Sequence, residues 1–218
     1  MLIARRNGLM AGGGLSAKDY VQDGLVAMWD GIENAGWGQH DPSGLVELVS
    51  GTAATLNNIT IGSNYLGFNG TNSHILVNGY NYLRIECVFS ATNDNCAIAA
   101  ISGKGIAISL NTYFITKFGA TSKKWQWSHT PVQAGIMSAY TDIDSYFMQG
   151  RQGLPAPNSE TWGASEASAI GCRWRNGGVT LPFAGRIHSL RLYSTSSQDD
   201  AIANYAVDKA RFNLPDAT

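Results

Sequence analysis

Residues 82–91 read YLRIECVFSA, and this stretch decides the fold class. Its apolar side chains recur at every second position: Leu83, Ile85, Cys87 and Phe89. Successive side chains of a β-strand point to opposite faces, so a period of two predicts a strand with one buried face. Glu86 lies in the other phase and is therefore expected to face solvent.

Similar short apolar runs, separated by turn residues, continue along the chain from residue 24. They lie at 25–29, 56–61, 65–68, 74–77, 96–101, 106–110, 113–118, 125–127, 136–140, 146–148, 170–174 and 183–193. About a dozen strands without helical periods between them are typical of an all-β, antiparallel sandwich or barrel. The pair Asn69-Gly70 separates two of these runs and predicts a β-hairpin there.

The last long run, FAGRIHSLRLY at 183–193, changes phase along its length. Gly185 and Ile187 share one phase, whereas Leu190 and Leu192 share the other. A strand that keeps one face buried through such a change needs an extra residue, so a β-bulge is expected near His188-Ser189.

One segment has a helical period instead. Ser197 can accept a hydrogen bond from the backbone three residues on, which predicts a helix N-terminus there. The helix is expected to span roughly 199–212 and to end before Pro215. Three side chains at helical spacing are expected to pack on the sandwich: Ile202, Tyr205 and Phe212.

Composition excludes several classes of function. Charged residues make up 14% of the 218-residue chain and the formal net charge is −1, so no nucleic-acid partner is expected. No apolar run reaches the ~20 residues of a membrane-spanning helix, so no membrane insertion is expected. The three cysteines, Cys87, Cys96 and Cys172, have no C-x-x-C spacing and are expected to be buried free thiols, without a disulfide framework or zinc site.

Residues 1–22 differ from the rest of the chain. They carry Arg5 and Arg6 and then three consecutive glycines, residues 12–14, which predict a flexible hinge. We interpret residues 1–22 as a flexible arm, either a disordered terminus or an attachment segment, and residues 23–218 as the folded domain. The glycine-rich sequence after the arginines is a poor secretory signal.

Four stretches together resemble a known family. They are GLVAMWDG at 24–31, YLGFNGTNSHILV at 65–77, SAIGCRW at 168–174 and FAGRIHSLRLYSTSSQDDAIANY at 183–205. In this order they resemble the laminin-G-like, concanavalin A-like jelly-roll family, across residues 24–212 and least well at 111–160. The resemblance implies a jelly-roll sandwich with a short C-terminal helix. The start, MLIARRN, and the end, NYAVDKARFNLPDAT, resemble proteins encoded by bacteriophages and prophages of gut bacteria.

Hydrolytic chemistry is not indicated by the sequence. Jelly-roll glucanases carry an E-x-D-x-x-E pattern that places carboxylates on one strand face near the sugar. That pattern does not occur in this sequence, and the most similar stretch, Asp142-Ile143-Asp144, contains no glutamate. The four histidines are scattered and show no nucleophile arrangement. We therefore expect no enzymatic activity, with a glycoside hydrolase as the least favoured alternative.

Carbohydrate binding is better supported by the residue types present. Aromatic rings stack on the C–H faces of sugars, while amides and hydroxyls bond the sugar hydroxyls. Trp125 and Trp127 share one face of a predicted strand, which is either core or a binding platform. The expected carbohydrate-binding residues are Trp125, Trp162, Arg173, Trp174 and Asn176.

The family resemblance also implies a possible calcium site, since many laminin-G-like domains hold one at the sandwich rim. Asp30 and Asp41 would supply hard oxygen ligands. The alternative is that these aspartates cap tight turns. No other cofactor is expected.

These observations together predict a non-catalytic structural protein on the surface of a phage or prophage virion, with a lectin-like domain that attaches to a glycan or host surface. Arg5 and Arg6 of the arm would contact other virion proteins, and a homo-oligomer is possible in such a setting. Three alternatives stay open: a secreted bacterial carbohydrate-binding module, a purely structural capsid or tail decoration protein, and a glycoside hydrolase.

Overall fold

A computed structural model describes most of the chain. The described residues are 15–32, 45–109, 113–118, 121–126, 135–142, 146–148, 151–152, 154–156 and 167–214. Side chains are described in 15–32, 45–108, 135–142 and 167–214.

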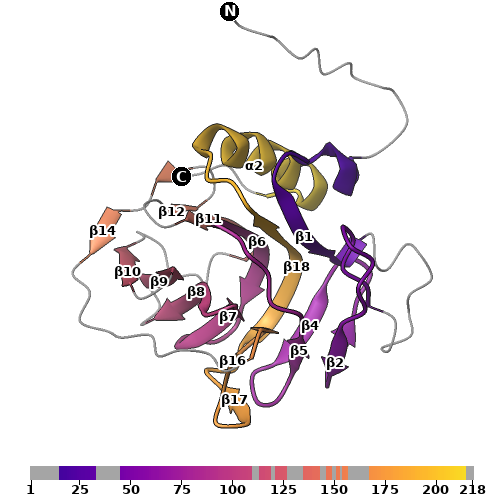
Figure 1. The fold of residues 1–218 in the computed structure, drawn as a ribbon, viewed down its shortest axis with the longest axis vertical. Helices are drawn as coiled ribbons and strands as arrows, with labels where there is room; N and C mark the ends of the chain where they lie inside the picture. Colours follow the sequence, from indigo (N-terminus) through magenta and orange to yellow (C-terminus); the bar gives the residue numbers. More distant parts are fainter. Residues whose placement is uncertain are drawn as a thin grey trace, which may run out of the picture.

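Two antiparallel sheets face each other (Figure 1). The first sheet has the order β13 (Arg151–Gln152), β12 (Tyr146–Met148), β11 (Met137–Asp142), β6 (Arg84–Ala91), β18 (Ala184–Tyr193), β4 (Leu66–Asn69) and β3 (Thr60–Ile61), with β1 (Leu25–Asp30) also paired to β18. The second has the order β14 (Leu154–Ala156), β10 (Thr121–Gln126), β9 (Tyr113–Phe118), β8 (Lys104–Ser109), β7 (Cys96–Ile101), β15 (Ala169–Ile170), β5 (His74–Leu76) and β2 (Thr55–Asn57). A separate hairpin pairs β16 (Arg173–Arg175) with β17 (Gly178–Thr180). The predicted all-β sandwich is confirmed.

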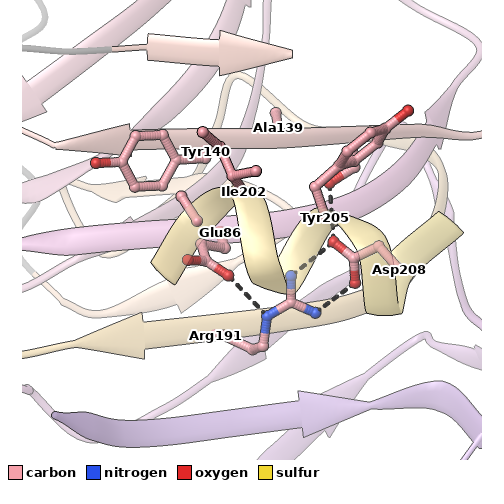
Figure 2. Close-up of a pocket in the computed structure, with 9 residues that line it drawn as sticks. Glu86, Ala139, Tyr140, Arg191, Ile202, Tyr205 and Asp208 are labelled. Atoms are coloured by element: carbon pink, nitrogen blue, oxygen red, sulfur yellow. Dashed lines mark hydrogen bonds and ion pairs between the residues drawn. The ribbon is translucent and has the colours of Figure 1, made fainter. Parts of the chain in front are cut away.

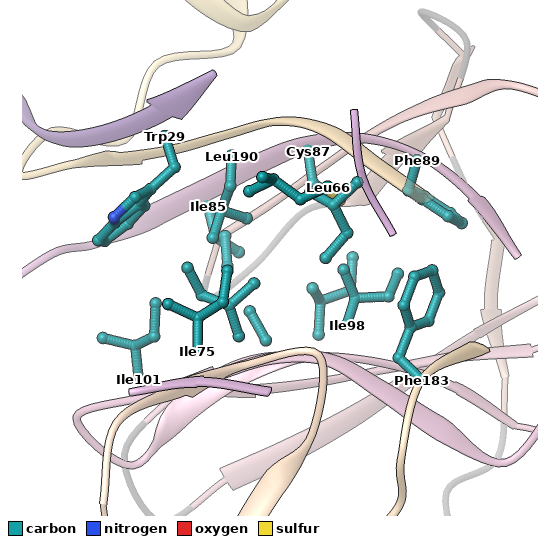
Figure 3. Close-up of a cluster of buried hydrophobic side chains, with 14 of the residues drawn as sticks. Trp29, Leu66, Ile75, Ile85, Cys87, Phe89, Ile98, Ile101, Phe183 and Leu190 are labelled. Atoms are coloured by element: carbon teal, nitrogen blue, oxygen red, sulfur yellow. The ribbon is translucent and has the colours of Figure 1, made fainter. Parts of the chain in front are cut away.

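The core lies between the two sheets. Ile85, Cys87 and Phe89 of β6 point inward from the first sheet and are fully buried. They face Ile75 and Ile98 of the second sheet, as Figure 3 shows. Full burial of an aliphatic or aromatic side chain stabilises a fold by about 1.5–3 kcal/mol. The period-two pattern that predicted this strand therefore corresponds to the interior of the sandwich from Ile85 on. The predicted burial of Leu83 is wrong, because it precedes β6 and is 47% exposed. All three cysteines are buried free thiols, as predicted.

The predicted hairpin at Asn69-Gly70 is wrong. The chain turns there, but β4 belongs to the first sheet and β5 to the second, so the two strands do not pair. The side-chain oxygen of Asn69 accepts hydrogen bonds from the backbone N–H groups of Thr71, Asn72 and Ser73. These hydrogen bonds satisfy the backbone N–H groups of the turn without any pairing between β4 and β5. The turn therefore takes the chain from the first sheet to the second instead of folding it back along one sheet.

The predicted bulge in β18 is present. Its pairing with β6 shifts between Ile187 and Ser189, so His188 is the extra residue. On the other side of β18, β4 pairs with the stretch before the bulge and β1 with the stretch after it. Arg186 and Arg191 are five residues apart, which would place them on opposite faces of a regular strand. Because of the bulge, both lie on the outer face of the first sheet, opposite Ser90 and Glu86 of β6.

Helix α2 (Gln198–Phe212) begins at Ser197, whose hydroxyl accepts a hydrogen bond from the Asp200 N–H, as the sequence predicts. It covers part of the outer face of the first sheet. Its buried residues are Ala201, Asn204, Asp208 and Phe212. The prediction that Ile202 packs on the sandwich is wrong, because its side chain is 46% exposed.

The prediction that Glu86 faces solvent is also wrong. Glu86 does lie on the outer face, but α2 covers that face and leaves the residue 2% exposed. The flanking outer-face residues Arg84 and Val88 are buried with it. Residues 84–88 of the central strand β6 are therefore buried on both sides, by apolar contacts inside and by a largely charged contact outside.

The boundary of the predicted arm needs correction for residues 15–22. A 3-10 helix, η1 (Ala17–Asp19), begins at Ser16, which forms a capping box with Asp19. Tyr20 is 2% exposed and donates a hydrogen bond to Asp208 of α2, while the Val21 N–H donates to Asn204. Residues 20–22 thus belong to the folded domain. Arg5 and Arg6 lie outside the described residues. No helix among the described residues is long and apolar enough to cross a membrane.

Candidate functional site

A buried charged cluster lies between α2 and the first sheet (Figure 2). Arg191 donates to both carboxylate oxygens of Asp208 at 2.7 Å and to Glu86 at 3.1 Å. Arg84 forms a second ion pair with Glu86 at 3.0 Å. Burial raises the pKa of Glu86, an effect that the two arginines oppose.

This charged cluster holds the helix in place and leaves no room for a substrate. The cavity that it lines has a volume of about 10 Å³, room for one water molecule at most. Glu86 and Asp208 are committed to arginines, and the Asn204 amide donates to Glu86 as well. A pair of acids in such a place cannot reach a sugar, so the cluster is structural.

Asp30, one of the two predicted calcium ligands, lies at the edge of this cluster. It is fully buried, and its two carboxylate oxygens accept hydrogen bonds from Arg211 at 2.7 and 3.1 Å. No group of three or more metal-binding side chains occurs among the described residues. Asp41 lies outside them, so a calcium site stays a prediction from the resemblance.

An open groove of about 440 Å³ lies on the part of the same outer face that α2 leaves uncovered. Its lining comes from β3, β4, β6, β18 and the adjoining turns: Asn58, Thr60, Tyr65, Gly67, Phe68, Asn69, Ser90, Thr92, Gly185 and Arg186. This groove is the main candidate site.

Strand register explains the floor of the groove. Thr60 of β3 lies opposite Gly67 of β4, Gly67 opposite Arg186 of β18, and Arg186 opposite Ser90 of β6. These four residues form one row across four strands. Gly67 contributes no side chain, and a Cβ there would lie 3.3 Å from Thr60 and 3.4 Å from the Tyr65 ring. The surface of the sheet is therefore depressed at Gly67, in the middle of the row.

Gly185 brings the two central strands together at the end of the groove. Its φ of +142° is a conformation that other residues rarely adopt, and a Cβ would lie 2.1 Å from the Ser90 carbonyl oxygen. Only glycine fits there.

Arg186 is the cation of the groove. Its guanidinium carbon lies 4.4 Å from the centre of the Tyr65 ring, and its side chain is exposed. Two other neighbours pack against Tyr65: a Cβ at Gly62 would lie 2.4 Å from the ring, and the His188 ring lies edge-on to it with centroids 6.0 Å apart. A guanidinium stacked on a ring packed in this way has a restricted orientation, so its N–H groups are preorganised for a ligand.

The remaining polar side chains of the groove are uncommitted. Asn58, Thr60, Ser90 and Thr92 make no side-chain hydrogen bond among the described residues. The Asn69 amide, by contrast, is used within its own turn. One amide and three hydroxyls thus surround Arg186 and can exchange hydrogen bonds with a polar ligand.

The β16–β17 hairpin, which carries three of the predicted site residues, is linked to this groove through a chain of contacts. Trp174 is partly exposed, and its ring packs on His74 with centroids 5.0 Å apart. The Nδ1 of His74 is hydrogen-bonded to the backbone carbonyl oxygen of Asn72. The side-chain oxygen of Asn72 in turn accepts a hydrogen bond from the side-chain amide of Asn69, which lines the groove. The turn at 69–74 therefore connects the groove to the hairpin.

The other predicted residues of this hairpin have clear local roles. Arg173 donates to the hydroxyl of Thr180 across the hairpin at 3.2 Å. Asn176 is exposed and takes a positive φ of 52° in the turn. Trp125 lies in β10, opposite Phe114 and Pro155, and its side chain lies outside the described part. Trp162 also lies outside the described residues.

Sequence reasoning missed Tyr65 and Arg186. The available signal was the period of two: Gly67 alternates with Leu66 and Phe68, and Arg186 alternates with Gly185 and Ile187. Small and polar residues in the outward phase of neighbouring strands mark an outer face that side chains leave open.

Comparison with known proteins supports the fold and goes no further. No family model matches the chain, and no curated protein matches it. Among solved structures, it is similar to Trypanosoma rangeli sialidase in complex with 2,3-difluorosialic acid, with a TM-score of 0.61, 13% identity, and coverage of 96% of this chain and 36% of the sialidase. The same sialidase in complex with sialic acid gives a TM-score of 0.59, 14% identity, and coverage of 85% and 33%.

The chain thus spans about a third of the length of the sialidases it matches. At these identities the similarity shows a shared β-sandwich fold. That fold is the one implied by the laminin-G-like resemblance, while membership of that family and the phage origin stay predictions. The Ruminococcus gnavus IT-sialidase CBM40 bound to alpha2,3 sialyllactose gives a TM-score of 0.44, which is too low to support an inference.

Proposed function

We propose that this protein is a non-catalytic glycan-binding module whose ligand lies in the groove around Gly67. The observation that carries the proposal is the set of uncommitted amide and hydroxyl groups across an open sheet face. Sugars offer many hydroxyls that both donate and accept hydrogen bonds, and uncharged amides and hydroxyls pair with them without the cost of burying a charge.

The lack of acids in this groove favours binding over hydrolysis. Glycoside hydrolases place two carboxyl groups beside the scissile bond, about 5–10 Å apart. None of the described residues that line the groove is an aspartate or glutamate. The solved sialidases act on sugars, but this chain matches about a third of each, so their activity does not transfer with the fold.

A blocking substitution tests the proposal. Gly67→Leu puts a side chain into the low centre of the groove, between Thr60 and the Tyr65 ring, where a Cβ would lie 3.3 Å from Thr60 and 3.4 Å from the ring. Binding to a glycan array, followed by titration calorimetry with the best ligand, should show at least a tenfold loss. Ala203→Leu adds similar bulk to an exposed position of α2 and serves as the matched control.

Thermal unfolding followed by circular dichroism would establish that both variants fold. Two results would contradict the proposal: wild-type protein that retains no glycan, or full binding by a folded Gly67→Leu variant. Release of reducing sugar from the bound glycan would favour the hydrolase alternative. Trp174→Ala in the same assay tests whether the ligand extends to the hairpin.

The proposed setting is the surface of a phage or prophage virion, and it is supported by the basic start of the chain and its resemblance to phage-encoded proteins. Deletion of residues 1–14 removes Arg5 and Arg6 and leaves Ser16, which caps η1, and Tyr20, which donates a hydrogen bond to Asp208 of α2. If those residues attach the protein to particles, the deletion should abolish incorporation while glycan binding persists. Unchanged incorporation would remove the attachment role.

A further inference from the structure

The arginines with described side chains divide into two groups. Three are paired with carboxylates beneath α2: Arg84, Arg191 and Arg211. The other three have no carboxylate partner among the described residues: Arg173, Arg175 and Arg186. None of these three guanidinium groups is therefore held by an ion pair within the described residues.

The two groups occupy different parts of the molecule. In Figure 1 α2 lies at the top and the β16–β17 hairpin at the bottom. Arg173 and Arg175 belong to that hairpin, whereas Arg186 lies in the groove, which the turn at 69–74 connects to the hairpin. Arg186 is therefore the member of the unpaired group that lines the candidate site, although the whole chain has a net charge of −1.

This arrangement costs energy in the free protein. Burial and the nearby charge of Arg175 together lower the pKa of Arg173. Like charges within the hairpin repel one another, and an anion that binds there relieves the repulsion.

Among the three, Arg186 is best placed to contact a ligand. It is exposed, it lines the groove, and its stacking on Tyr65 preorganises the guanidinium. A planar guanidinium matches two oxygens of a carboxylate or sulfate, and such charge-assisted pairs are stronger than neutral hydrogen bonds.

We infer that the groove selects acidic glycans, with the carboxylate or sulfate of one sugar bound by Arg186 and its neighbouring hydroxyls bound by Thr60, Ser90 and Thr92. This inference rests on the proposed glycan-binding function and specifies its ligand class.

The test compares acidic sugars with their neutral counterparts. Calorimetric titrations would use trigalacturonate and its carboxyl-reduced form, sialyllactose and lactose, and a sulfated oligosaccharide and its desulfated form. We expect the wild-type protein to bind at least one acidic member about 10- to 100-fold more tightly than its partner. The pairs distinguish a carboxylate from a sulfate as the bound anion.

Arg186→Gln should remove this preference while the weaker binding of the neutral member persists. Arg186→Lys keeps the positive charge but loses the planar guanidinium, so this variant should retain only part of the preference for the acidic member. Lys18→Gln, the same change of charge at an exposed residue of η1, should leave the preference unchanged.

Three results would overturn the inference. The first is equal binding of acidic and neutral members by wild-type protein, which leaves the proposed function intact. The second is an equal loss of both members in Arg186→Gln, which makes the arginine structural. The third is an effect of Lys18→Gln as large as that of Arg186→Gln, which indicates unspecific charge attraction. Failure of every sugar to bind would instead refute the proposed function itself.

Discussion

Asp208→Asn is the substitution most informative about how α2 is held on the sheet. The Asp208 carboxylate accepts four hydrogen bonds: from Tyr20 at 2.6 Å, from Ser138 at 2.8 Å and from the two terminal nitrogens of Arg191 at 2.7 Å each. Asp208 and Arg191 are each 1% exposed. Asparagine keeps the volume, removes the charge and replaces one acceptor oxygen by a donor that faces other donors.

The expected cost follows from the burial of the pair. Removal of one partner of a buried ion pair typically costs 3–5 kcal/mol, because the other charge stays buried without compensation. Arg191 keeps its contact with Glu86 at 3.1 Å, so we expect the lower end, about 3 kcal/mol. The double variant Asp208→Leu/Arg191→Met removes both charges and should cost less than Asp208→Asn alone.

Urea unfolding measures these free energies, with circular dichroism reporting α2 and fluorescence reporting the tryptophans. Asp199→Asn, at an exposed carboxylate in the first turn of α2, is the control and should cost no more than about 1 kcal/mol. A loss below about 1 kcal/mol for Asp208→Asn, or a double variant less stable than the single, would refute the assignment of the cluster as a tightly packed structural contact.

Two further predictions concern buried titratable groups. Burial lowers the pKa of His188, so the imidazole of the unfolded protein takes up a proton first as the pH falls below about 6.5. The free energy of unfolding, measured at pH 7.5, 6.5 and 5.5, should therefore decline more steeply in the wild type than in His188→Gln, by up to about 1.4 kcal/mol per pH unit. Parallel curves for the two proteins would contradict this prediction. Burial also raises the pKa of Cys96 and of Cys172 to about 12, and that of Cys87 above its ordinary value. A thiol reagent at pH 8 should therefore label none of the three in the native protein and all three in guanidinium, and rapid native labelling would be inconsistent with their burial.

Local patterns predicted the elements of this fold well. The period of two in residues 85–89, the phase change at His188 and the capping residue Ser197 each depend on neighbours within a few positions, and each appears in the structure as expected. The predictions that failed depend on what covers a surface. Ile202 and Glu86 were assigned to the wrong environments because the sequence pattern does not reveal that α2 docks through polar residues onto a charged sheet face.

The candidate site was predicted in part for the same reason. Trp174 and Asn176 were selected because aromatic and amide residues near a turn suit sugar binding, and they lie in the hairpin linked to the groove. Arg186 was not selected because nothing in the run FAGRIHSLRLY distinguishes it from Arg191. Only the path of the helix decides that Arg191 is covered and paired while Arg186 is left open.

The bulge at His188 connects stability and function in this domain. Without the extra residue, Arg186 and Arg191 would lie on opposite faces, and one of them would point into the apolar core, where an unpaired charge is costly. With it, both arginines share the outer face, and β18 presents one to Asp208 and the other to the groove. The Tyr65 ring stacks with Arg186 and contacts the ring of His188 itself. The bulge at His188, which keeps both arginines out of the apolar core, therefore also places Arg186 in the groove, where the proposed selectivity depends on it.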